Sequence, residues 1–263
     1  MSVYIKPGGG ATLTASQVTG LHWNPVSTDW KVMWNDFSGP RSSGTLGYSG
    51  GTIGFNSVIA GSGSTTTPTP TAYADRYGVL KCGIGSAAGA IAGVESSHSD
   101  STYRFGDGRI KFGAAIKLND LPAATTADFD MCVGMGNNVT TFASEACYWY
   151  CDVGTNATNW LLYNNGTSTS LVDSTVALAT DWVNLEIDVA ADLSSVKFYM
   201  NGTLYHTETN SANIPAAGTE CNFQIAARAT AMTATKVFEI DWAYVAIKPT
   251  NTRGDITTWV DEL

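Results

Sequence analysis

The chain has 263 residues, a formal net charge of −9 and a pI near 4.6, and only 14 of its residues are Lys or Arg. Because an acidic chain without a basic run repels phosphate backbones, the composition argues against a nucleic-acid partner. No segment approaches the ~18 consecutive apolar residues of a membrane span, and residues 1–10 lack the apolar core of a signal peptide. Charged residues make up 14% of the chain while Gly, Thr, Ser and Asn are abundant, which favours short strands and tight turns over helices.

The N-terminal residues 1–29 show no hydrophobic periodicity and are predicted to form an extended arm. Trp23 in this arm and Trp30 directly after it are expected to dock on another surface and so to make assembly contacts. A single β-sandwich domain is predicted over 30–249. Within it, the Gly-, Thr- and Pro-rich segment 60–71 is expected to form a low-complexity surface loop.

Segments with period-two alternation follow one another through this domain at roughly ten-residue spacing, which is typical of a two-sheet sandwich. Between two of them stands Asn201–Gly202, a strong hairpin signal because both turn residues must reach positive φ. Strict alternation in the last strand places Trp242 and Tyr244 on the same face as Ile240. The predicted strands cover 30–37, 52–59, 78–84, 108–118, 127–135, 147–153, 159–163, 168–172, 181–190, 195–200, 203–209, 221–228 and 236–249, followed by a C-terminal tail over 250–263.

The cysteines are scattered and lack the spacing of a metal site or a disulfide framework. Cys147 and Cys151 fall on one face of a predicted strand, where four residues at ~3.3 Å each separate them by about 13 Å, too far for a disulfide. Buried free thiols are therefore expected, which favours folding in a reducing cytoplasm. The five cysteines are Cys82, Cys132, Cys147, Cys151 and Cys221.

Three segments in the second half of the chain carry a resemblance to a known superfamily: WVNLEIDV (182–189), VKFYMNGTLYHT (196–207) and FEIDWAYVAIK (238–248). Their order resembles concanavalin A-like lectin/glucanase domains, including the laminin-G-like group. The resemblance implies an all-β, two-sheet antiparallel jelly-roll sandwich with one concave sheet, as also found in phage virion structural proteins. The motifs are structural, so they say little about function.

One pattern, Glu186-x-Asp188 followed by Asp192, is similar to the E-x-D-x-x-E strand of laminarinase-type glycoside hydrolases. In that family the first Glu is the nucleophile and the last is the acid/base, and retaining hydrolysis requires the two carboxyls ~5 Å apart. The nearest acidic residue to the last position is Asp192, which lies one residue beyond it and is one methylene shorter than Glu. The second Glu is therefore missing, and an ordinary strand with a polar outer face explains the pattern better. The same explanation fits Glu239 and Asp241. No catalytic residue is predicted, and the chain is expected not to be an enzyme.

A group of aromatic residues around one predicted hairpin supplies the candidate glycan-binding residues, since flat rings offer a surface on which sugars stack. For Trp149 and Trp160 an alternative is favoured, in which both fill the sandwich core. The candidate residues are Tyr148, Trp149, Tyr150, Trp160 and Tyr163.

Members of the resembled superfamily often bind Ca²⁺ through Asp and Asn at loop ends, and Asp107, Asp128 and Asp130 have suitable oxygens. Turns and solvated strand edges use the same residues, so no cofactor and no metal site are predicted. The histidines are too few and too scattered for a zinc site or a catalytic triad. They are His22, His98 and His206.

Two functions from different classes fit these features. The favoured one is a non-enzymatic virion structural protein, most simply a bacteriophage capsid decoration or tail-associated protein assembled in the host cytoplasm. A Gly-rich arm, few charges and a jelly roll without a catalytic pair resemble many phage virion components. Its partners would be other capsid subunits, as a homo-oligomer, and host surface glycans, with neither nucleic acid nor membrane. The alternative is a carbohydrate-binding, lectin-like module; a glycoside hydrolase ranks third and would need Glu186.

Overall fold

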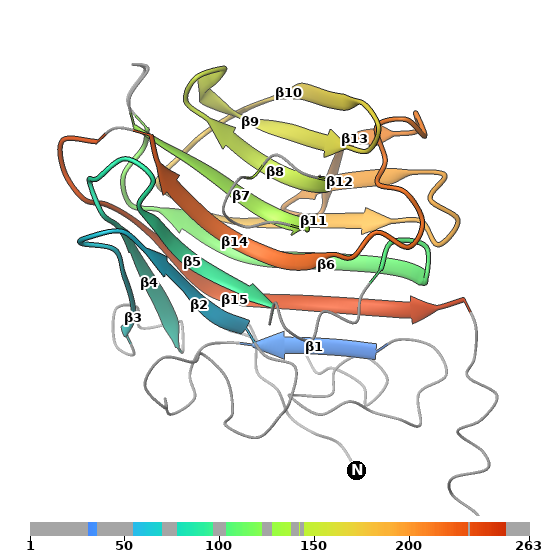
Figure 1. Ribbon diagram of the computed structural model, residues 1–263, viewed down its shortest axis with the longest axis horizontal. Coiled ribbons are helices and arrows are strands. Elements are labelled where there is room, and N and C mark those ends of the chain that lie inside the picture. Colours follow the sequence, from blue (N-terminus) through green and yellow to red (C-terminus); the bar gives the residue numbers. More distant parts are fainter. Residues whose placement is uncertain are drawn as a thin grey trace, which may run out of the picture.

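The computed structural model describes residues 31–35, 55–69, 78–96, 104–122, 128–137, 142, 145–230 and 232–250. These residues form two packed antiparallel β-sheets (Figure 1), which confirms the predicted all-β jelly-roll sandwich. The described ranges hold no helix that is long and apolar enough to cross a membrane. The predicted arm 1–29, with Trp23, and also Trp30 lie outside the described residues, as does nearly all of the predicted tail.

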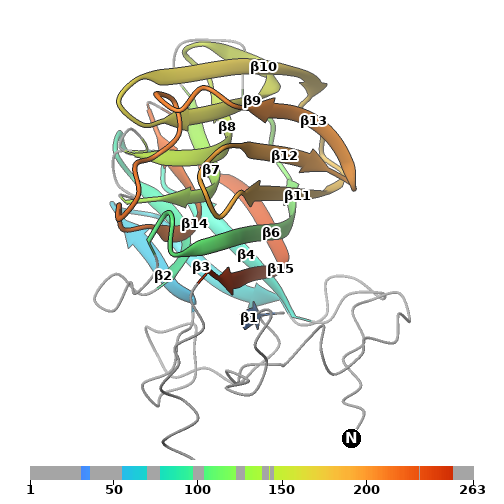
Figure 2. The same cartoon turned by 90° about the vertical axis from the view of Figure 1, so that its right-hand side faces the viewer.

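The two sheets have eight and seven strands, and Figure 2 shows them from the side. In spatial order the eight-stranded sheet contains β13 (Thr203–Glu208), β12 (Val196–Met200), β11 (Trp182–Val189), β6 (Gly108–Leu118), β15 (Lys236–Pro249), β4 (Val79–Ile84) and β3 (Thr65–Thr69), with β1 (Lys31–Asn35) also paired to β15. The seven-stranded sheet contains β10 (Thr169–Ala177), β9 (Asn156–Asn165), β8 (Ala146–Asp152), β7 (Phe129–Gly136), β14 (Asn222–Ala229), β5 (Ile91–Ser96) and β2 (Phe55–Ala60).

Alternating apolar side chains from both sheets form the main core. Strand β6 is a clear example, because Ile110, Phe112 and Ile116 are buried between the sheets while Arg109 and Lys117 point outward. The predicted hairpin is confirmed as the β12–β13 turn, where Asn201 and Gly202 have φ values of 50° and 78°. Period-two alternation therefore positions most of the sandwich.

The segment 60–71 differs from its prediction as a loop. Thr65–Thr69 form strand β3, which pairs with β4, and only the short turn before it connects β3 to β2 in the other sheet. Thr favours strands, and Pro68 is tolerated because β3 is the last strand in its sheet. The low-complexity segment therefore contains an edge strand.

Strand β15 contains a bulge that changes which of its side chains face the core. Its pairing with β6 skips Asp241, so this residue is extra. Ile240 before the bulge and Ala243 after it both lie in the core. The strict alternation expected for this strand is therefore wrong, because Trp242 and Tyr244 lie on the outer face instead of on the face of Ile240.

Candidate functional site

The bulge in β15 presents two aromatic rings together on the outer face of the eight-stranded sheet. Trp242 and Tyr244 are both half-buried, and their ring centroids lie 5.9 Å apart with an interplanar angle of 24°. We call them the aromatic pair. Their neighbours on β6 are small, because Ala115 is in register with Trp242 and Gly113 with Tyr244. Small residues beneath large rings leave the pair room to lie on the sheet.

Tyr244 extends across β6 to the next strand. A Cβ atom on Gly113 would come 2.4 Å from Cε1 of Tyr244, so glycine lets the ring lie close to the strand and any larger residue would have to displace it. The Tyr244 hydroxyl donates a hydrogen bond to Oε2 of Glu186 on β11, at 3.2 Å. Burial and the neighbouring Glu186 carboxylate raise the pKa of Tyr244, so the phenol remains a donor at neutral pH.

The carboxylate of Asp188, two residues along β11, is held by two cations on β6. Arg109 Nε donates to Asp188 Oδ1 at 2.8 Å, and Lys111 Nζ lies 3.5 Å from Oδ2. Asp188 is only 5% exposed, while the Arg109 and Lys111 side chains remain 46% and 35% exposed. The hydrogen bond to Asp188 raises the pKa of Arg109. The outer face therefore carries a fixed ion-pair cluster beside the aromatic pair.

The three carboxylates of the pattern Glu186-x-Asp188 with Asp192 each have a different partner. Asp192 lies in the turn after β11, where its Oδ1 accepts a hydrogen bond from the Ser194 amide at 3.0 Å, and its hydrogen bonds with Ser194 lower the pKa of Asp192. Asp188 is neutralised by its cations, and Glu186 is bonded to Tyr244. In the second E-x-D pattern, Glu239 is buried and Asp241 is the bulge residue.

The predicted aromatic group is divided between two sides of the seven-stranded sheet. Trp149 and Trp160 are buried in the main core, where their rings meet edge to face at 6.5 Å. Their assignment to a glycan-stacking surface is therefore corrected, and the favoured alternative holds for both. Tyr148, Tyr150 and Tyr163 point to the outer face, because neighbouring residues on a strand point to opposite sides.

These three tyrosines form a second, smaller cluster on the outer face of the seven-stranded sheet. Tyr148 is 1% exposed, stacks on Tyr163 at 6.0 Å and donates a hydrogen bond to Oε1 of Gln224 at 3.0 Å. Phe142 packs against the same cluster. Tyr163 is also buried, so Tyr150 is the most accessible of the three, being half-buried. Glycan binding by these tyrosines stays a prediction.

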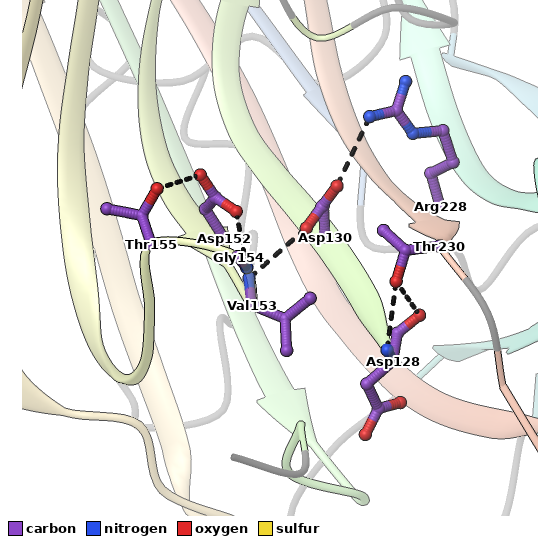
Figure 3. Close-up of polar contacts among 8 residues, drawn as sticks. All are labelled: Asp128, Asp130, Asp152, Val153, Gly154, Thr155, Arg228 and Thr230. Atoms are coloured by element: carbon purple, nitrogen blue, oxygen red, sulfur yellow. Dashed lines mark hydrogen bonds and ion pairs between the residues drawn. The ribbon is translucent and has the colours of Figure 1, made fainter. Parts of the chain in front are cut away.

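Two of the acidic residues considered for Ca²⁺ are ion-paired, Asp130 with a residue of the neighbouring strand β14 and Asp128 with a residue of β15 in the other sheet. Asp130 Oδ2 lies 3.3 Å from Nη2 of Arg228, and its Oδ1 accepts a hydrogen bond from the Val153 amide (Figure 3). Asp128 lies 3.7 Å from Nζ of Lys236. Burial, reinforced by the nearby Asp152, raises the pKa of Asp130.

Within the described ranges, no group of three or more His, Cys, Asp or Glu side chains could hold a metal ion. Asp107 is also among these residues but belongs to no such group. His206 is on β13, where its ring lies 6.3 Å from that of Phe198, and the other two histidines lie outside the described residues.

All five cysteines are buried and free, as predicted. Burial raises the pKa of Cys132, Cys147, Cys151 and Cys221. Because the thiolate is the reactive form, these side chains act as small apolar core residues.

Sequence reasoning missed the aromatic pair because a bulge has no reliable sequence signature. Both candidate faces of 236–249 contain apolar residues, so alternation alone does not choose between them. The available signal was the placement of Glu239 and Trp242 three residues apart. In a regular strand, residues three apart point to opposite faces. One face can therefore carry both Glu239 and Trp242 only if the strand contains an extra residue between them.

Comparison with known proteins identifies the fold. No protein-family model and no curated protein matches the chain. A Shewanella oneidensis protein of unknown function is 14% identical, with a TM-score of 0.61 over 89% of this chain and 93% of that one. An endo-1,3-β-glucanase from Streptomyces sioyaensis is 11% identical (TM-score 0.52, 85% and 98% covered), and an endo-β-1,4-glucuronan lyase from the fungus Trichoderma reesei is 13% identical (TM-score 0.51, 72% and 90% covered). At 11–14% identity these likenesses show the fold alone, a two-sheet sandwich shared over most of each chain.

Proposed function

We propose that this protein binds glycans without catalysing their cleavage, through the aromatic pair on the outer face of the eight-stranded sheet. The observation that carries the proposal is the pair itself: Trp242 and Tyr244 lie side by side, half-buried, over the small residues of β6. Rings fixed in this way offer apolar contact area without the entropic cost of ordering flexible side chains.

Polar groups suited to sugar hydroxyls flank the aromatic pair. Asn184 on β11 is exposed and in register with Ala115, the residue that also faces Trp242. Glu186 is half-buried beside Tyr244 and has a further oxygen, Oε1, to offer. An apolar surface bordered by a few fixed polar groups is the usual composition of a small-molecule site.

The comparison structures support glycan contact only in part. Two of them are named for activity on polysaccharides, a β-glucan and a glucuronan, and both are enzymes. Our proposal of a non-enzymatic protein therefore rests on this chain's own carboxylates. Asp188 is held by Arg109 and Lys111, and Asp192 is occupied in its own turn, so Glu186 has no acid partner from its motif.

The test compares one variant on each outer face in a glycan-array and calorimetry experiment. Trp242→Ala should abolish measurable glycan binding while leaving the thermal transition within a few degrees, because the ring is half-buried. Tyr150→Ala, on the opposite face, is the matched control and should bind like the wild type. Loss of binding in Tyr150→Ala alone would transfer the site to the tyrosines predicted from the sequence, and equal binding by both variants would refute the proposal.

We also propose a setting for this activity: a structural protein of a virus particle, as a bacteriophage capsid decoration or tail-associated subunit. Exposed apolar side chains on the two strands at one end of the sandwich favour contacts with other subunits. Leu171 on β10 is 38% exposed, and Leu204 and Tyr205 on β13 are 48% and 42% exposed. Among the described strands, β10 and β13 are the outermost at that end (Figure 1). Exposed large apolar residues on edge strands favour a protein interface.

Density-gradient sedimentation of a producing lysate, with mass spectrometry for this chain, tests that setting. We expect the chain to migrate with nucleic-acid-containing particles in stoichiometric amounts. Deletion of 1–29 and the Leu204→Asp substitution should each abolish incorporation. Ile59→Asp, at an equally exposed position on β2 (49%), is the control and should incorporate normally. A chain that stays at the top of the gradient would rule out the virion role and leave glycan binding untouched.

A further inference from the structure

The two outer faces of the sandwich carry opposite charge. Among described strand residues, basic side chains outnumber acidic ones on the outer face of the eight-stranded sheet, and the outer face of the seven-stranded sheet is mainly acidic. The first set comprises basic Lys81, Arg109, Lys111, Lys117, Lys197 and Lys248 and acidic Glu186, Asp188, Glu239 and the bulge residue Asp241. The second comprises acidic Glu95, Asp130, Asp152 and Asp173 and basic Arg228.

This segregation is unexpected in a chain whose net charge is −9. Alternation on β6 produces much of it, because Arg109, Lys111 and Lys117 all point away from the core. A surface that gathers one sign of charge in a chain dominated by the other attracts ligands of the opposite sign. The basic side thus attracts anions although the whole molecule repels them.

The basic residues of β6 bracket the aromatic pair. Gly113 and Ala115 lie in register with the pair, and Lys111 and Lys117 are the next outward-facing residues on either side. Two residues of strand span about 6.6 Å, so each lysine starts roughly one sugar ring away from the pair. A ring stacked on the pair would have a cation within reach at both ends of β6.

We infer that the ligand of this face is an anionic glycan, whose sugar rings stack on Trp242 and Tyr244 while carboxylate, sulfate or phosphate groups meet Lys111 and Lys117. This inference rests on the proposed glycan-binding function. Asp188 strengthens the arrangement because it fixes Arg109 and Lys111 on the outer face. Nucleic acid is a weaker fit, because a long polyanion would also meet the net negative charge of the rest of the chain.

The experiment measures affinity for matched pairs of oligosaccharides on the intact chain. Polygalacturonate, sialylated and sulfated oligosaccharides are each compared with a neutral counterpart of the same length, such as the methyl-esterified galacturonate. We expect at least one acidic form to bind ten times more tightly or better than its counterpart at low salt, with the preference shrinking in 0.5 M NaCl. Lys117→Gln should weaken acidic binding about three- to fivefold and leave neutral binding unchanged.

Arg104→Gln is the matched control, because it removes the same charge from an exposed residue that pairs with Glu220 outside the strands of both sheets. It should bind like the wild type. Equal affinity for acidic and neutral forms would overturn this inference and leave the proposed glycan binding intact. No binding to any oligosaccharide would overturn both. A single-stranded DNA decamer that competes as well as the best acidic glycan would overturn the assignment to a glycan.

Discussion

On the outer face of each sheet a tyrosine side chain lies over a glycine, but the two tyrosines differ in their exposure to solvent. On the seven-stranded sheet the hydroxyl of Tyr148 lies over Gly136, and on the eight-stranded sheet the ring of Tyr244 lies over Gly113. Each tyrosine then donates to a side chain on another strand. Tyr148, however, is fully buried in a second apolar cluster, whereas Tyr244 is half-buried beside charged groups. The same motif therefore stabilises one face and exposes a binding surface on the other.

The largest expected effect is the difference in stability between removing an aromatic ring from the core and removing one from the outer face. Trp149→Ala should lower the free energy of unfolding by about 3–5 kcal/mol, because it leaves a cavity in the main core. Trp242→Ala should cost about 1 kcal/mol or less, since its ring is half-buried. Urea unfolding measures both. Similar costs for the two variants would show that Trp242 is a core residue and unsuited to bind a ligand.

Next in size is the matched pair of glycine substitutions. A Cβ on Gly136 would lie 1.8 Å from the hydroxyl of Tyr148, which is fully buried, so Gly136→Ala should cost about 2–3 kcal/mol of stability. Gly113→Ala meets a ring that can lift from the half-buried face, and it should cost about 1 kcal/mol. Chemical denaturation of both variants checks the order, and a reversed order would break the contrast between the faces.

Removing one hydroxyl from each tyrosine is a gentler probe. Tyr148→Phe takes away the hydrogen bond to a buried Gln224 oxygen, so we expect a loss of about 1–2 kcal/mol. Tyr244→Phe leaves the Glu186 carboxylate half-exposed to water, and its cost should be about 0.5 kcal/mol. Thermal unfolding at neutral pH distinguishes the two. Equal losses of stability would mean that the Gln224 carboxamide and the Glu186 carboxylate are equally shielded from water.

The smallest expected effect is on the pH dependence of stability. Burial raises the pKa of Asp130, so the folded state binds this proton more tightly than the unfolded state and stability declines as pH rises above about 4. Asp130→Asn should remove that decline. Asp192 has the opposite sign, because hydrogen bonds from Ser194 lower its pKa, and Asp192→Asn should reduce the stability lost on acidification below about pH 4. Denaturation series from pH 3 to 7 follow both slopes, and an unchanged slope in Asp130→Asn would contradict the assignment.

Strong alternation and turn chemistry made most of the sandwich predictable. Strand β6 was expected over 108–118 and found over Gly108–Leu118, and the Asn201–Gly202 turn was found where predicted. Strand β5 was missed because its run of Ala and Gly resembles a loop, although Gly93 is needed there: a Cβ would meet the Ile225 carbonyl oxygen of β14 at 2.2 Å. Strand β5 forms because its backbone packs closely against that of β14, and a single sequence does not show such an approach.

The candidate site was less predictable than the fold. The tyrosines of β8 and β9 were identified, but sequence does not show that Tyr148 and Tyr163 are buried on their outer face. The aromatic pair was assigned to the wrong face because one extra residue, Asp241, reverses the alternation. Sites that depend on a bulge or on packing between distant strands require three-dimensional information.

The central claim is that ligand binding belongs to the eight-stranded face, and an NMR titration of labelled protein with a bound acidic oligosaccharide tests it directly. We predict shifts of the Trp242 indole and of the Gly113 amide, with little change at Tyr150. Shifts confined to Tyr150, Tyr163 and Leu171, with an unperturbed Trp242 indole, would contradict the claim and assign binding to the seven-stranded face.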